Sequence, residues 1–166
     1  MLQPVVRRTW APVGQTPIHA TWDRRDRMSV IGALSLSPAS GRIGAYFNYQ
    51  YENITTDSVV FFIKELHRHL QRKLIVVWDR WSVHRSAARK LSEKHRWFHA
   101  AEWLPSYCPE LNPVEAMWSF TKYSHLANFI PEDVMHLEDE VLKCLGKQAN
   151  DKRLKQSFFK TARLKL

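Results

Sequence analysis

The sequence predicts an α/β domain in which a mixed sheet is flanked by helices, and three observations lead to this prediction. The apolar run Leu74 to Trp78 is too short for a typical helix and too uniformly apolar for a half-exposed strand, so it predicts a buried parallel strand. Helical periodicity precedes this run, and a second strand-like run follows it. Two further strand-like runs lie upstream and are separated by a turn.

The first third of the chain predicts a loop followed by a hairpin. Prolines and a glycine punctuate residues 1–27, which indicates loop with short extended pieces. Residues 28–36 and 42–49 predict two antiparallel strands, because Pro38 and Gly41 between them favour a turn.

A helix–strand–helix–strand pattern follows from Asp57. The first helix is predicted from apolar residues that share one helical face: Val59, Phe62, Ile63, Leu66 and Leu70. After the 74–78 strand, residues 86–95 predict a helix and residues 97–104 a strand. Because βαβ crossovers place their strands in parallel, both strands should end at the same edge of the sheet.

The last third is predicted to be helical. Residues 113–127 and 131–145 each indicate one helix, and 146–166 indicate a basic helical tail. Without an internal repeat or a low-complexity linker, residues 1–166 are expected to form a single domain.

The charge balance favours a polyanionic partner. The chain has 25 Lys and Arg against 16 Asp and Glu, a formal net charge of +9, which points first to nucleic acid. Solvated helix faces are the alternative explanation. The basic residues assigned to DNA contact are Arg80, Arg85, Arg89, Lys90 and Lys122.

Cysteine usage and hydropathy indicate a cytoplasmic protein. Cys108 and Cys144 show neither metal-type pairing nor a disulfide framework, so both are expected to be reduced thiols. Neither a bilayer-spanning apolar stretch nor a leader is expected, and no membrane partner is predicted.

Two acids are the candidates for chemistry. Asp79 directly follows a predicted strand, and ligands of open α/β sheets gather outside the carboxyl ends of strands. The alternative is that Asp79 turns the chain or caps the next helix. His84, five residues further on, is interpreted as a cap or a satisfied polar neighbour and is left out of the catalytic set.

The second acid lies in "LNPVEAMW", residues 111–118. Asn112 suits a helix N-cap and Pro113 the first helical position, so these two residues set where the helix begins. Glu115 then falls where it can complete a capping box, which is one reading of it. In the other reading, Glu115 and Asp79 face one rim of the sheet, where two carboxylates suit Mg²⁺ and phosphoryl displacement. Trp118 is expected to pack beneath the acid as core.

Four features together resemble a known family. They are "RRTWAPVGQTP" at 7–17, the strand ending in Trp78 and Asp79, "WLPSYCPELNPVEAMWSFTK" at 103–122, and the 35 residues that separate the two acids. In these features the chain resembles the DDE-type transposases of bacterial insertion sequences, in particular the mariner-like, insertion-sequence six-thirty group with its DDE superfamily endonuclease domain. The resemblance spans roughly residues 5–145.

This resemblance implies a ribonuclease H-like fold that carries three acids, of which Asp79 matches the second and Glu115 the third. It further implies that the acids bind two Mg²⁺ or Mn²⁺ ions, nick DNA at transposon ends and join the freed 3′ hydroxyl to target DNA. The implied partners are therefore DNA and a possible second copy of the chain.

One feature of the family pattern is expected to be missing. The family's first acid lies on the central strand, just upstream of the segment matched by "RRTWAP", so a truncation at the N-terminus is expected to remove both, as well as a helix-turn-helix region. Asp23 and Asp26 are interpreted as a polar turn and do not take that role. A frameshifted upstream chain that supplies the strand, a mis-assigned start and a decayed copy all remain open.

Two rival functions remain beside the transposase. One is a catalytically dead, DNA-binding remnant, and the other is a ribonuclease H-fold nuclease unconnected with a transposon.

Overall fold

The computed structural model describes residues 5, 7–15, 18 and 28–164. Asp23 and Asp26 lie outside the described residues. The regular elements are, in chain order, β1 (Ser29–Leu36), β2 (Ile43–Gln50), α1 (Thr56–Leu70), β3 (Leu74–Trp78), α2 (Ser82–Lys94), β4 (Phe98–Trp103), the 3₁₀ turn η1 (Pro109–Leu111), α3 (Pro113–Phe120), the π turn η2 (Thr121–His125), α4 (Val134–Asn150) and α5 (Lys152–Thr161).

The strands form one antiparallel and one parallel pair. β1 pairs with β2 from Ser29 opposite Gln50 to Leu36 opposite Ile43, which confirms the predicted hairpin. β3 pairs in parallel with β4 and ends at Trp78 opposite Trp103, which confirms the βαβ unit. The predicted mixed sheet is therefore divided into two pairs, because no strand among the described residues bridges β1 and β3.

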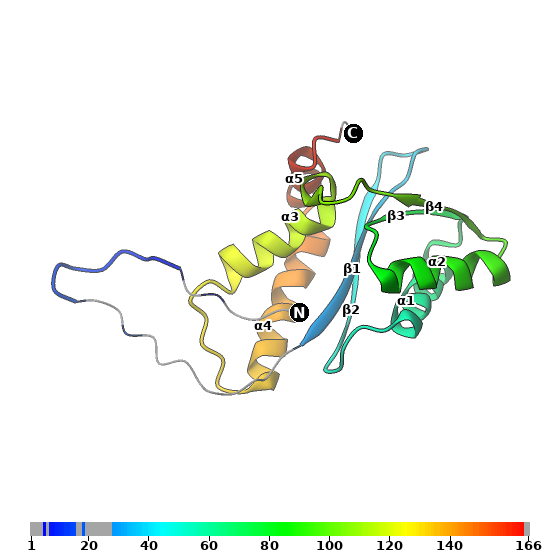
Figure 1. The fold of residues 1–166 in the computed structure, drawn as a ribbon. Helices are drawn as coiled ribbons and strands as arrows, with labels where there is room; N and C mark the ends of the chain where they lie inside the picture. Colours follow the sequence, from blue (N-terminus) through cyan, green and yellow to red (C-terminus); the bar gives the residue numbers. More distant parts are fainter. Residues whose placement is uncertain (1–4, 6, 16–17, 19–27, 165–166) are drawn as a thin grey trace.

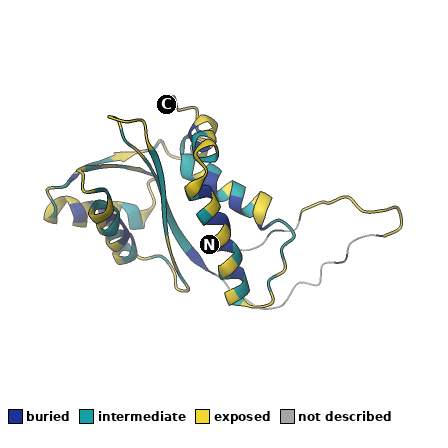
Figure 2. Cartoon of the chain, turned by 180° about the vertical axis from the view of Figure 1, so that it is seen from behind, coloured by how far each residue is buried: buried dark blue, intermediate teal, exposed yellow. Residues whose placement is uncertain are grey.

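Helices cover the hairpin from both sides (Figure 1). α1 and α2 lie on one side of β1 and β2, whereas α3, α4 and α5 lie on the other. The core is accordingly split into two clusters, and Figure 2 shows buried residues in the helices of both groups. The first cluster comprises Val59, Phe62, Ile63, Trp78, Ala87, Ala88, Leu91 and Phe98. The second comprises Met28, Leu126, Leu137, Val141 and Leu145.

Strand β3 is buried on one face only. Leu74, Val76 and Trp78 pack in the first cluster, whereas Ile75 is 60% exposed and Val77 is 59% exposed. The prediction of a fully buried strand was therefore wrong. The physical reason is that α1 and α2 cover one face, and no described element covers the side chains of the other face.

Helix boundaries differ from the predictions in the last third of the chain. The helix predicted over 113–127 is α3 followed by the π turn at Thr121–His125. The buried Thr121 hydroxyl donates to the Met117 carbonyl over 3.0 Å and accepts from the Gln148 side-chain amide over 2.8 Å. A hydroxyl that bonds to the preceding turn competes with regular helical bonding, which accounts for the change of pitch.

The predicted tail is part of the packed domain. α4 continues to Asn150, beyond the predicted end at residue 145, and α5 follows after Asp151. Phe158 and Phe159 of α5 are buried, so this basic helix also contributes to the core. None of the helices in the described ranges is long and apolar enough to cross a membrane.

A glycine brings α3 close to β1. A Cβ atom placed on Gly32 would lie 2.7 Å from both Met117 Cε and Trp118 Cζ2. Trp118, predicted to be core, is partly buried and packs against the second cluster. The contact holds α3, the helix that carries Glu115, against the hairpin.

Replacing this glycine is expected to destabilise the fold. Gly32→Ala should lower the free energy of unfolding by about 1–3 kcal/mol, because the added methyl group must displace a rigid indole ring. Urea denaturation measures the change. Gly146→Ala in α4 is the matched control: nothing lies within 4 Å of its added Cβ, and a helical alanine should stabilise by about 0.5–1 kcal/mol. Equal stability of Gly32→Ala and the wild type would contradict the close packing.

Candidate acidic site at the ends of β3 and β4

Asp79 lies at the carboxyl end of β3, where the sequence placed it. Its side chain is 54% exposed, and its Oδ1 accepts two hydrogen bonds. One comes from the backbone N–H of Trp81 over 3.0 Å and the other involves Nδ1 of His84 over 2.7 Å. The bond to Trp81 spans two residues, as in a turn closed by an aspartate side chain. The turn-forming role considered for Asp79 is therefore present, and it uses Oδ1.

Glu115 lies in the first turn of α3, and its helix begins as predicted. Asn112 Oδ1 accepts from the Val114 N–H over 3.2 Å, and Pro113 is the first helical residue. The capping box expected as one reading of Glu115 is not formed, because the cap is made by Asn112 alone. Within the described part of the chain, no hydrogen bond or ion pair engages the Glu115 carboxylate, which is exposed and borders a hollow of about 480 Å³ between α3 and α5.

The two acids follow the paired ends of β3 and β4. The Leu104 N–H donates to the Trp78 carbonyl over 3.0 Å, which extends the parallel pairing to the end of both strands. Arg80 Nε donates to the Leu104 carbonyl over 3.4 Å, so the residue after Asp79 is tied to the end of β4. From this edge the chain passes through η1 into α3 and Glu115.

The donor set suits a hard cation in kind but is small in number. Carboxylate oxygens are the ligands that Mg²⁺ prefers, and Mg²⁺ is usually held by one or two protein carboxylates together with substrate phosphates and water. Nowhere in residues 28–164 do three or more His, Cys, Asp or Glu side chains gather in a way that could hold a metal ion. Asp79 and Glu115 are thus ligands of the right kind, but the hollow that Glu115 borders is lined by residues of η1, α3 and α5 and not by Asp79.

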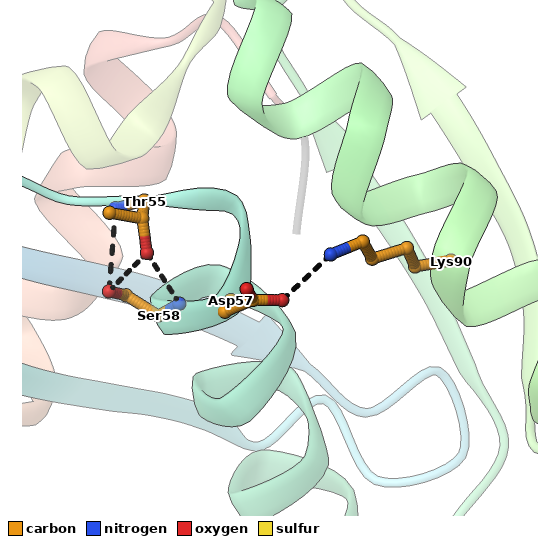
Figure 3. Close-up of polar contacts among 4 residues, drawn as sticks. All are labelled: Thr55, Asp57, Ser58 and Lys90. Carbon is orange, nitrogen blue, oxygen red and sulfur yellow. Dashed lines mark hydrogen bonds and ion pairs between the residues drawn. The ribbon is translucent and has the colours of Figure 1, made fainter.

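The five basic residues assigned to DNA contact lie in different surroundings. Arg80, Arg85 and Arg89 are exposed on or just before α2, and Lys122 is partly buried on the π turn. Lys90 Nζ lies 2.8 Å from Asp57 Oδ1 and so joins α2 to α1 (Figure 3). The hydrogen bond from the Lys90 ammonium, together with its charge, lowers the pKa of the Asp57 carboxyl.

Figure 3 also shows why Asp57 stands at this position. Thr55 Oγ1 accepts from the Ser58 N–H over 3.2 Å and the Ser58 hydroxyl accepts from the Thr55 N–H over 3.4 Å, which forms a capping box at the start of α1. Asp57 lies in the first turn, where an acid is favoured by the helix dipole. The beginning of α1 is thus held to the middle of α2 by this ion pair. The N-terminal end of α2 is held separately, by the hydrogen bond between His84 and Asp79.

Sequence reasoning missed one contact of the site and one contact outside it. It did not bring His84 to Asp79, although a spacing of five residues across a strand–helix turn was the available signal. It also did not place the "RRTWAP" segment beside the residues after α3. Arg7 donates from its backbone to Asn128 Oδ1 over 2.7 Å and from its guanidinium to the Tyr123 carbonyl over 2.6 Å.

Comparisons with known proteins identify the family and a similar fold. A family model described as DDE superfamily endonuclease matches residues 1–137. A chain in the crystal structure of the Mos1 strand transfer complex has a similar fold, with a TM-score of 0.57 and 16% sequence identity. That similarity covers 96% of this chain and 46% of the Mos1 chain, so this chain spans about half the length of the other. No curated protein matches the chain.

Proposed function

Because the chain belongs to the DDE superfamily endonuclease family, we propose that it is a transposase catalytic domain that acts on insertion-sequence DNA. In this proposal residues 1–166 are one domain that nicks the transposon end and transfers the freed 3′ hydroxyl to target DNA. The observation that carries the proposal is that two carboxylates, Asp79 and Glu115, follow the paired ends of β3 and β4 in a chain of this family.

Asp79 and Glu115 are the proposed catalytic residues, and both are proposed ligands of Mg²⁺ or Mn²⁺. When bound, such ions would activate the attacking oxygen and stabilise the leaving oxygen of an in-line displacement. Asn112 and Pro113 contribute indirectly, because they set the start of α3 and hence the position of Glu115. A complete two-ion site requires a third acid in addition to these two.

We propose that this third acid arrives on a strand that pairs beside β1 and β3. One feature supports the proposal: in the described residues each of these strands has one hydrogen-bonded neighbour. A strand edge without a partner presents a row of unpaired N–H and C=O groups, which favours pairing with a further strand. The proposed source of the strand is either the same gene or an upstream reading frame, and a second copy of this chain is a further proposed partner.

The nucleotides upstream of the Met1 codon test the origin of this strand. We expect one of the three reading frames to encode a short apolar run that ends in an acid, either in frame or joined through a frameshift site. Stop codons or unrelated sequence in all three frames would contradict a supplied strand. That result would favour the second candidate function, a catalytically dead DNA-binding remnant, which is also consistent with the small donor set.

Metal-dependent nicking distinguishes the two candidates. Asp79→Asn should reduce nicking of supercoiled plasmid DNA in Mn²⁺ by at least about 100-fold, because loss of a metal ligand removes several kcal/mol of transition-state stabilisation. DNA affinity should change little, since the carboxylate does not attract phosphate. Asp139→Asn, at an exposed acid of α4, is the control. A wild-type chain that binds DNA but shows no metal-dependent nicking, either alone or joined to the upstream-encoded strand, would leave only the remnant.

The salt dependence of DNA binding tests the basic surface. Arg85 and Arg89 lie four residues apart on the exposed surface of α2, so both can meet one phosphate backbone. Arg85→Gln combined with Arg89→Gln should reduce the slope of log K against log salt by about 0.9 for each lost phosphate contact. Lys90→Gln should reduce the slope less, because the Lys90 ammonium is bonded to Asp57. Fluorescence anisotropy over a salt series measures the slopes, and an unchanged slope in the double variant would refute the assignment.

The proposed place of action is the cytoplasm. Cys108 and Cys144 are both free thiols, and no disulfide is needed to hold the described elements together.

A further inference from the structure

The Asp79 carboxylate is held by a group outside its own turn. Trp81 supplies a backbone N–H to Oδ1, as any residue at that position would, but the second partner of Oδ1 is the imidazole of His84 at 2.7 Å. A carboxylate can only accept hydrogen bonds, so His84 Nδ1 is the donor and carries the proton. With two donors on Oδ1, the orientation of the carboxylate about its own axis is fixed.

His84 is itself fixed by aromatic packing. Its side chain is 24% exposed, and its ring is stacked on Trp78, with the ring centroids 5.2 Å apart and the planes 18° from parallel. The indole of Trp81 meets the same imidazole edge-on, at 5.2 Å and 83°. Because Trp78 is buried in the first core cluster, the imidazole is oriented by the core of the domain.

Helix capping does not explain this arrangement. An N-cap side chain bonds to the backbone N–H of the second or third helical residue. The N-cap residue of α2 is Trp81, whose side chain makes no capping bond. Asp79 bonds to the N–H of Trp81 itself and to the imidazole of His84, the third helical residue, so its carboxylate leaves the first-turn N–H groups of α2 unused.

We infer that His84 is a positioning residue for Asp79: it binds Oδ1 so that Oδ2 is presented to a divalent cation at the end of β3. The inference rests on the proposed function, because it requires Asp79 to be a metal ligand. Carboxylates that ligate metals are themselves held by hydrogen bonds from neighbouring groups, and removal of such a neighbour typically weakens metal binding about 10–100-fold. His84 is not a catalytic residue in this scheme, since it acts through Asp79.

Three substitutions separate the hydrogen bond from the packing. His84→Phe retains an aromatic ring against Trp78 but removes the donor. His84→Asn places an amide nitrogen near the position of Nδ1, so it can still donate to Asp79. His84→Gln places its amide further out, near the position of Nε2, and is the matched control for His84→Asn because both are uncharged amides.

The measurement is a titration of the full chain with Mn²⁺ alone, with free Mn²⁺ followed by electron paramagnetic resonance and folding checked by thermal unfolding. Asp79→Asn defines the binding that depends on the proposed site. We expect His84→Phe and His84→Gln to weaken Asp79-dependent Mn²⁺ binding about 10–100-fold, and His84→Asn to restore most of it at similar thermal stability.

The outcomes distinguish this inference from the proposed function. Wild-type affinity in folded His84→Phe or His84→Gln would overturn the positioning role and leave Asp79 as a ligand. Equal weakening in His84→Asn and His84→Gln would also overturn it, because the hydrogen bond would then not be the cause. Identical Mn²⁺ binding by the wild type and Asp79→Asn would refute the metal site of this chain, and the positioning role with it.

Discussion

The arrangement of the site depends on the parallel pairing of β3 with β4. Paired residues run from Leu74 opposite Phe98 to Trp78 opposite Trp103, and the Leu104 N–H continues the pairing to the end of β3. Since parallel strands end at the same edge, Asp79 and the connection that leads to Glu115 leave the sheet together. An antiparallel pairing would send that connection to the opposite edge, and no choice of side chains would bring the acids to one rim.

The same pairing leaves β3 unfinished on the side away from β4. Its helix-covered face contributes Trp78 to the core, but Ile75 and Val77 on the other face remain more than half exposed. Apolar area left in water forgoes stabilisation of about 25 cal/mol per Å². In the described residues β3 also has no second hydrogen-bonded neighbour, and no three His, Cys, Asp or Glu side chains gather to hold a metal ion. One further strand that ends in an acid would therefore pair with the free edge of β3 and add a donor for the proposed chemistry.

Local patterns in the sequence predicted the elements, whereas distant contacts decided the details. The hairpin, the strand before Asp79 and the Asn112 cap follow from composition and spacing within a few residues. The π turn could not be predicted in this way, because the Thr121 hydroxyl is bonded to Gln148, 27 residues further along the chain. The exposure of Val77 could not be predicted from the sequence either. An apolar run indicates that a strand is suited to burial, but it does not indicate whether other elements cover both of its faces.

The two readings of Asp79, as a turn residue and as a ligand, are compatible because a carboxylate has two oxygens. The turn and the imidazole engage Oδ1, and in the described residues no hydrogen bond engages Oδ2. An aspartate that only closed a turn would need the Trp81 N–H alone; it would not need an imidazole oriented by a buried tryptophan. The added constraint restricts the carboxylate further than the turn requires, and such restriction is useful where a ligand must meet a cation in one geometry.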